Sequence, residues 1–226
     1  MCSRYSQTLP ADAMRSLFGY RNQVELQPRE AIAPSEPVPV VRQTGGQARE
    51  LVLMRWGLVP SWVKDPNEFS MLINARSETA LEKPSFRAAM RHRRCLIPAD
   101  GFYEWTGPKG ERRPFHVARA DGGPIAFAGL WEHWQGAGGE EMESVTILTT
   151  SANADLAALH HRMPVLLDPD DFDAWVDCER IPAEEVMELL CAAPDGLLEP
   201  AAVERQAANP RRTDRGAPEP FQGSLF

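Results

Sequence analysis

The sequence predicts an α+β fold, a single domain with a curved, barrel-like, mostly antiparallel sheet flanked by short helices. Many short apolar runs are separated by turn residues such as Gly and Pro, which is typical of a sheet-rich domain. These runs do not alternate with helices in the regular way of βαβ units, which excludes a doubly wound parallel sheet. The 226 residues suffice for one domain with its own core, which we place at 2–204.

The predicted strands are short and rich in apolar residues. The strongest is 51–56, which precedes a Gly-Leu-Val-Pro stretch, and the runs 94–98 and 101–105 are joined by a short turn. The other expected strands are 38–42, 114–118, 125–134, 144–149 and 164–167, with a hairpin tip at 109–111 and a glycine-rich loop at 136–139.

The expected helices are also short. Residues 168–175 begin with Pro169 and several acidic residues, which favour the positive end of a helix. The other helical stretches are 10–18, 82–94 with its helical character after Pro84, 155–160 and 182–191. From residue 205 onward the chain has almost no apolar residues to bury, so we expect a disordered tail at 205–226.

The charge is unevenly distributed. The net charge of −8 argues against a protein that coats nucleic acid generally, but residues 1–119 carry +6 and residues 120–226 carry −14. The first half could therefore offer a face for phosphate, or the asymmetry is only a solvated surface.

Compartment and cofactors follow from what the sequence lacks. There is no apolar run long enough to span a membrane and no secretory signal, so we expect a cytoplasmic protein with reduced thiols. The four cysteines form no Cys-x-x-Cys pair and have no histidine at zinc-finger spacing, so we expect no metal and no cofactor.

Cys2 is the most unusual position in the sequence. If Met1 is removed, Cys2 carries an α-amine with an ordinary pKa of about 8 and a thiol with one of about 8.5, both usable as nucleophiles near neutral pH. An aldehyde can form an imine with such an amine, and the thiol can then close a thiazolidine ring. A Cys at this position is also compatible with chance.

Three further stretches place polar residues among apolar or turn residues. They contain Asn74, Glu104 and the pair His160 and His161. Asn74 could cap a turn. Glu104 shares a strand face with Phe102, so it is either an exposed edge residue or a buried carboxyl with a raised pKa that suits proton transfer.

The other candidates also have ordinary alternatives. At least one of the adjacent histidines should face solvent, and Arg162 could simply pair with an acid of its own half. Trp56 and Trp62 could pack in the core or stack on bases.

Taken together, the motifs resemble the SOS-response-associated peptidase (SRAP) family of abasic-site processing proteins. The resemblance extends from Cys2 to about Pro200. Its motifs occur in the family's order, namely Cys2 with Arg4, Trp56-Gly-Leu-Val-Pro-Ser-Trp62, Asn74-Ala-Arg-Ser-Glu-Thr79, Pro98 to Trp105 and His160 to Pro164.

The resemblance implies an α+β fold with a DNA-binding groove, and a covalent thiazolidine link to abasic sites in single-stranded DNA. The family's catalytic positions fall on Cys2, Asn74, Glu104 and His160, the last chosen over His161 by the order His-x-Arg-Met-Pro. Positions that hold DNA phosphates in the family fall on Arg4, Arg76 and Arg162, and Trp56, Trp62 and Phe102 could wedge or stack at a strand break. A nucleoid-associated location follows from the same resemblance.

Three positions depart from the family's pattern. Ser3 stands where Gly is usual, Ala31 replaces an Asn, and Glu204 replaces an Asn. None of them is a predicted catalytic residue, so they concern the rim of the groove more than the chemistry.

Two other functions compete with DNA cross-linking. One is a thiol peptidase that uses Cys2 with His160 as base, including removal of its own Met1. The other is a non-enzymatic DNA or protein adaptor, whose binding would not depend on Cys2.

The last five residues carry a separate hypothesis. Gln222-Gly-Ser-Leu225-Phe226 resembles the peptide by which many bacterial DNA proteins bind the replication sliding clamp, with Gly223 in place of the usual Leu. The alternative is that these residues are only the end of a tail.

Overall fold

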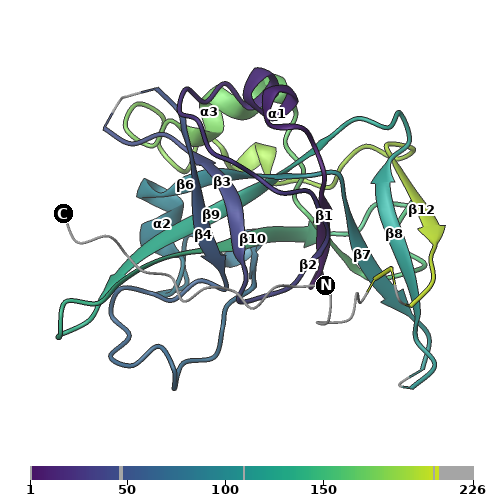
Figure 1. Ribbon diagram of the computed structural model, residues 1–226, viewed down its shortest axis with the longest axis horizontal. Helices are drawn as coiled ribbons and strands as arrows, with labels where there is room; N and C mark the ends of the chain where they lie inside the picture. The colour runs from purple at the N-terminus through teal and green to yellow at the C-terminus, as the bar shows by residue number, and fades with distance from the viewer. Residues whose placement is uncertain (1, 46–47, 109, 206, 209–226) are drawn as a thin grey trace.

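The computed structural model describes residues 2–45, 48–108, 110–205 and 207–208. Within this part of the chain the strands form two sheets, and Figure 1 shows α1 and α3 together at the top of the view, with α2 apart from them beside the barrel. This α+β architecture with a closed, curved sheet confirms the predicted fold class.

The larger sheet closes on itself as a barrel. Strand β10 pairs with β4 on one side and with β9 on the other, and the remaining pairs are β4 with β3, β3 with β6 and β6 with β9. The barrel strands are β3 (Pro37–Arg42), β4 (Glu50–Trp56), β6 (Arg94–Ala99), β9 (Ile125–Gln135) and β10 (Glu141–Ser151). All pairs except β10 with β4 are antiparallel. Closure leaves few free sheet edges.

Two short strands extend the far end of β10. Strand β5 (Asn74–Arg76) pairs with it in parallel, and β11 (Arg162–Pro164) pairs with it antiparallel. Residues separated by almost ninety positions in the sequence are therefore held on one strand.

The second sheet has the order β12-β8-β7-β1-β2. Its strands are β1 (Tyr5–Gln7), β2 (Arg29–Ile32), β7 (Gly101–Thr106), β8 (Arg113–Arg119) and β12 (Leu198–Ala202). Figure 1 shows β1 and β2 next to the barrel, with β8 and β12 farthest from it. Pro200 lies in the terminal strand β12, where its missing N–H leaves no inner ladder bond unmade.

The helices are short and end where backbone chemistry requires. Helix α1 (Ala11–Phe18) follows Pro10 and stops at Gly19, which has a φ of 68° and donates its N–H to the Arg15 carbonyl. The others are α2 (Arg87–His92) and α3 (Phe172–Val176), with 3-10 turns at Ser77–Thr79, Pro169–Asp171 and Met187–Leu189.

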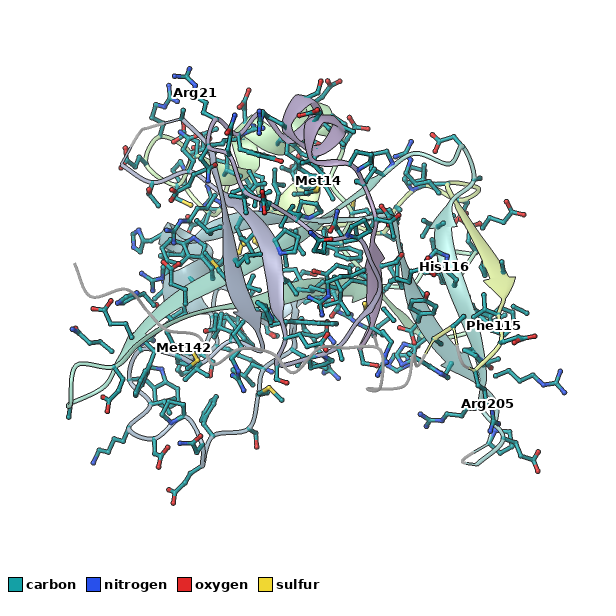
Figure 2. The ribbon with its side chains drawn as sticks, in the orientation of Figure 1. Met14, Arg21, Phe115, His116, Met142 and Arg205 are labelled. Carbon is teal, nitrogen blue, oxygen red and sulfur yellow. The ribbon has the colours of Figure 1, made fainter. Side chains whose placement is uncertain are left out.

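The core has two main parts. One lies between the barrel and the helices, where Phe18 of α1 stacks on Phe172 of α3 with ring centroids 5.3 Å apart. Met14 of α1 belongs to this part, and its label in Figure 2 lies between α1 and the strands. The other part lies between the two sheets and includes Cys2 and Tyr5. The beginning of the chain is thus core material.

Several element predictions were wrong in detail. Residues 155–160 form turns rather than a helix, because Asn153 and Asp155 bond to backbone groups of residues 193–198 instead of supporting a helical repeat. Residues 182–191 contain a 3-10 turn with i to i+3 hydrogen bonds, not an α-helix. The expected strand 164–167 ends as β11 at Pro164, with a single bridge at Leu166.

Four strands were not predicted from the sequence: the three-residue strands β1 and β5, and strands β2 and β12. Packing continues past residue 204, where the domain was predicted to end, since Ala208 is 1% exposed and contacts the cluster of Ala31 and Tyr103. Three parts of the predictions lie outside the described residues: Lys109 of the expected hairpin tip, and residues 206 and 209–226 of the tail predicted at 205–226, which include the clamp-binding peptide.

Candidate active site

Cys2 lies in the core between the two sheets with no exposed surface. Its thiol is 3.6 Å from the Arg4 carbonyl, and its own carbonyl accepts a 2.8 Å hydrogen bond from the Asn74 side-chain amide. Burial raises the pKa of the Cys2 thiol, and the nearby negative charge of Glu104 raises it further. The thiol is therefore held in its protonated form.

Asn74 reaches Cys2 because β5 is fixed from both sides. Ile147 of β10 is the register partner of Asn74, and the buried Trp56 indole N–H donates to the Ile73 carbonyl at 2.9 Å. The Asn74 oxygen Oδ1 is buried and accepts no hydrogen bond from the described residues. Asn74 thus links β5, beside the barrel, to Cys2, which lies a few residues before β1, and it retains an acceptor on the same amide.

Glu104 is a buried carboxyl, the second of the two alternatives that the sequence left open. It lies on β7 with 3% of its surface exposed, on the same strand face as Phe102. Loss of hydration raises the pKa of Glu104, and the positive charge of the N-terminus opposes this. A carboxyl with a raised pKa can hold or release a proton closer to neutral pH.

His160 is held by the backbone of Arg162. The Arg162 N–H lies 2.9 Å from His160 Nδ1, and because a backbone amide can only donate, Nδ1 accepts. The Arg162 carbonyl lies farther from the same nitrogen, at 3.2 Å, so the shorter bond to the amide favours the neutral ring with its proton on Nε2. Partial burial lowers the pKa of His160, which keeps the ring neutral at neutral pH. The neighbouring His161 ring stacks on it and is exposed, as expected for one of the pair.

The three predicted phosphate-binding arginines differ in their surroundings. Arg76 is exposed at the end of β5, and Arg4 is half-buried before β1. Arg162 is 8% exposed, and its guanidinium bonds to both oxygens of Glu78 and to the Thr149 carbonyl. Arg76 is open to a phosphate, whereas at Arg162 a phosphate would have to replace Glu78.

The predicted aromatic contacts separate in the same way. Trp56 and Phe102 have no exposed surface, and Trp56 packs edge-on against Tyr5 with centroids 5.3 Å apart. Base stacking by these two side chains does not fit this structure, because both faces of each ring are covered by the core. Trp62 is 58% exposed and meets Phe69 edge-to-face at 5.8 Å, so it can receive a base.

Two residues of this region were not among the predicted site residues. Glu78 appeared only as a letter of a motif, and its partner Arg162 lies 84 residues away. Tyr5 is fully buried beside Trp56, and its hydroxyl has no hydrogen-bond partner among the described residues. The contacts of Glu78 with Arg162 and of Tyr5 with Trp56 cannot be predicted from a sequence pattern, because they join segments that meet only in the folded chain.

The described residues contain no cluster of His, Cys, Asp and Glu side chains arranged to hold a metal ion. None of the helices in the described ranges combines the length and apolar character needed to cross a bilayer.

Comparison with known proteins decides the relationship. The sequence profile of the SOS response associated peptidase (SRAP) family matches residues 1–210. The chain belongs to the SRAP family. This confirms the resemblance drawn from the ordered motifs around Cys2, Asn74, Glu104 and His160.

Named relatives of this SRAP protein come from bacteria and vertebrates. It is 35% identical to the abasic site processing protein YoqW of Bacillus subtilis over 195 residues, which cover 84% of this chain and 86% of YoqW. It is 30% identical to the abasic site processing protein HMCES of Gallus gallus, covering 84% of this chain and 69% of HMCES.

Solved structures share the fold. A protein of Bordetella bronchiseptica is 31% identical, with a TM-score of 0.76 over 90% of this chain and 100% of that one. A protein of Bacteroides thetaiotaomicron, at 24% identity, has a TM-score of 0.81 over 95% of this chain and 100% of its own.

Proposed function

We propose that this SRAP protein acts in the response to DNA damage by processing abasic sites in single-stranded DNA, and that it links Cys2 covalently to the damaged sugar. The observation that supports this proposal is the position of Cys2. Its carbonyl accepts a hydrogen bond from Asn74, and the charge of the buried Glu104 acts on its thiol. The names of the relatives YoqW and HMCES support the substrate.

The proposed reaction uses both nucleophiles of Cys2 after Met1 is removed. The abasic sugar opens to its aldehyde, the Cys2 amine adds to C1′, and loss of one water gives an imine. The thiol sulfur then adds to C1′ while its proton passes to the nitrogen, which closes the thiazolidine. Atoms balance with the release of one water, and no oxidant or reductant is needed.

Glu104 and His160 supply proton transfer in this proposal. Glu104, with its raised pKa, can exchange a proton with the sugar or the Cys2 amine. The Arg162 amide occupies His160 Nδ1, which leaves Nε2–H as the donor for the ring oxygen as the sugar opens. Asn74 positions the Cys2 backbone through its carbonyl. Exposed Trp62 and Arg76 would contact base and phosphate.

Access to Cys2 is a requirement of the proposal. Cys2 has no exposed surface, so the aldehyde reaches its amine and thiol only when the site opens, and the amine is free to react only after Met1 is lost. An N-terminal extension that cannot be removed should therefore silence the protein without unfolding it.

The test is the intact mass of the purified protein with and without an abasic single-stranded oligonucleotide. We expect a denaturation-resistant adduct with the mass of protein plus DNA minus one water. Cys2→Ala should abolish it, whereas Cys191→Ala, which removes an exposed thiol, should leave it unchanged. An adduct of the same mass from the Cys2→Ala protein would refute the mechanism.

A thiol peptidase is the second candidate, and the family's name is the observation that favours it. A peptidase needs a Cys2 thiolate, but burial raises the pKa of this thiol. Amine-first chemistry suits such a thiol better, because the amine makes the first bond. Cleavage of a peptide panel that depends on Cys2, without any DNA adduct, would favour the peptidase.

The C-terminal peptide from Gln222 to Phe226 remains a separate proposal for sliding-clamp binding, with Leu225 and Phe226 as apolar anchors. Titration of the synthetic peptide against the clamp tests it, and absence of binding retires it. With the function in abasic-site processing we also propose a cytoplasmic, nucleoid-associated location.

A further inference from the structure

Arg162 is a buried cation with a fixed set of partners. Its Nη1 donates to Glu78 Oε1 at 2.5 Å, and its Nη2 donates to Glu78 Oε2 at 2.8 Å and to the Thr149 carbonyl at 2.5 Å. A two-pronged arginine–carboxylate pair fixes orientation as well as distance. The Arg162 side chain is 10% exposed and that of Glu78 is 49% exposed, so the arginine is buried and the carboxylate is in contact with solvent.

The backbone of Arg162 is the group that holds His160. Arg162 in β11 pairs with Ser151 of β10. The carbonyl of the preceding residue, His161, accepts a hydrogen bond from the Ala152 N–H. The Arg162 N–H then donates to His160 Nδ1 at 2.9 Å. A short three-residue strand alone is a weak support, so the side-chain bonds of Arg162 add a second attachment for the same backbone.

These contacts form a continuous path from an exposed carboxylate to a ring nitrogen. It runs from Glu78 through the guanidinium and backbone amide of Arg162 to His160 Nδ1. Nδ1 lies 2.9 Å from the Arg162 N–H and 3.2 Å from the Arg162 carbonyl, and the shorter contact to the amide favours the neutral ring with its proton on Nε2. The position of the Arg162 amide therefore sets which nitrogen can donate.

We propose that Glu78 is a positioning residue that, through Arg162, holds His160 in its Nε2–H form. The role in catalysis rests on the function proposed above, whereas the effect on the ring does not. Arg162 acts in this arrangement as an internal anchor, with Glu78 in the place that a DNA phosphate would otherwise occupy. Loss of the Glu78 charge weakens the two-pronged bond and leaves the guanidinium held mainly by Thr149, which loosens the Arg162 amide and allows the proton to move to Nδ1.

The first experiment measures the ring directly in DNA-free protein. The ¹⁵N shifts of the His160 imidazole report which nitrogen carries the proton. We expect the Nε2–H form in the unaltered protein, a mixture of both forms in Glu78→Gln, and the Nε2–H form in Glu78→Asp, which keeps the charge. Glu82→Gln, which alters an exposed carboxylate of the same segment, is the control and should match the unaltered protein. An unchanged ring in Glu78→Gln overturns the proposal.

The second experiment separates rate from affinity. Single-turnover cross-linking to an abasic oligonucleotide should slow about tenfold in Glu78→Gln, which corresponds to about 1.4 kcal/mol. Its affinity for an oligonucleotide with a stable, non-reactive abasic analogue should stay within about twofold. Glu78→Asp should recover most of the rate, and it also serves if Glu78→Gln does not fold.

Two outcomes distinguish the competing interpretations. Tighter DNA binding by Glu78→Gln with an unchanged His160 ring would show that Glu78 merely competes with phosphate for Arg162, and would overturn the positioning role. If the unaltered protein forms no adduct, the proposed function fails, but the ¹⁵N shifts still decide whether Glu78 sets the state of the ring.

Discussion

Trp56 and Trp62 belong to one seven-residue motif, yet the structure gives them opposite environments. Trp56 is completely buried at the end of β4, packs on Tyr5 and bonds to the Ile73 carbonyl. Trp62 lies in the following loop with 58% of its surface exposed. Two tryptophans six positions apart therefore differ in role. Trp56 packs in the core beneath the site, whereas Trp62 is available for contacts at the surface.

The same division between buried and exposed positions applies to other predicted site residues. We call Cys2, Trp56 and Glu104 the buried floor, and Trp62 and Arg76 the exposed group. Changes in the buried floor should alter stability or reaction rate, because every atom there has packed neighbours. Changes in the exposed group should alter DNA affinity with little effect on stability.

The largest effect is expected from Trp56→Ala. Removing a fully buried indole should lower the free energy of unfolding by about 3–5 kcal/mol, and it also leaves the Ile73 carbonyl without its donor beside Asn74. Trp62→Ala should change stability by less than about 0.5 kcal/mol. Chemical denaturation of both variants checks this, and equal losses would break the comparison.

Trp62→Ala should instead weaken DNA binding. Stacking on one base is worth about 1–3 kcal/mol, so we expect about a 5- to 150-fold loss of affinity for single-stranded DNA. Fluorescence anisotropy with a non-reactive abasic analogue measures it. Trp62→Phe, which keeps an aromatic face, is the matched control and should retain most of the binding.

Glu104→Gln should slow the reaction and stabilise the fold. The folded-state pKa of Glu104 is raised, so its contribution to stability is complete below the ordinary value of 4.5 and is lost as the pH rises through the folded-state pKa. At pH 7 the variant should therefore have a higher melting temperature than the unaltered protein.

The pH dependence provides the control for this prediction. Below about pH 4 the carboxyl is protonated in both the folded and the unfolded chain, and the stability advantage of Glu104→Gln should vanish. Thermal melts across the pH range decide it, and an advantage that persists at low pH would assign the effect to packing rather than to charge.

The smallest effect is expected from Arg76→Gln. Loss of one phosphate contact on single-stranded DNA should reduce the slope of log affinity against log salt by about 0.7, with no change in melting temperature. Arg87→Gln, which alters an exposed arginine of α2, is the control. Equal slopes for the two variants would remove Arg76 from the DNA contact.

The fold class and the main strands could be predicted from the sequence, because apolar runs such as 51–56 and 94–98 are long enough to show a pattern. Strands β1 and β5 have three residues each, too few for any alternation, and they exist because β7 and β10 supply their partners. The predicted helix at 155–160 failed for the same reason, since side-chain bonds to residues 193–198 outweigh local helical preference.

The site residues could be named from motifs, but their environments could not be read from single letters. Alternation placed Glu104 beside Phe102 without deciding whether that face is buried. Arg162 and Arg76 looked alike in the sequence, and only the contact with Glu78 separates an anchored guanidinium from an exposed one. Burial and long-range pairing decide these properties, and neither is local.

The hydrogen bond from Asn74 to the Cys2 carbonyl has a consequence for the timing of synthesis. Cys2 is among the first residues to leave the ribosome, but β1 gains its β7 partner only after about a hundred residues, and His160 follows later still. A nascent chain therefore carries the reactive residue without the groups that would direct it. Under the proposed function, self-linkage is restricted to finished molecules, and a stalled or truncated chain stays harmless to DNA.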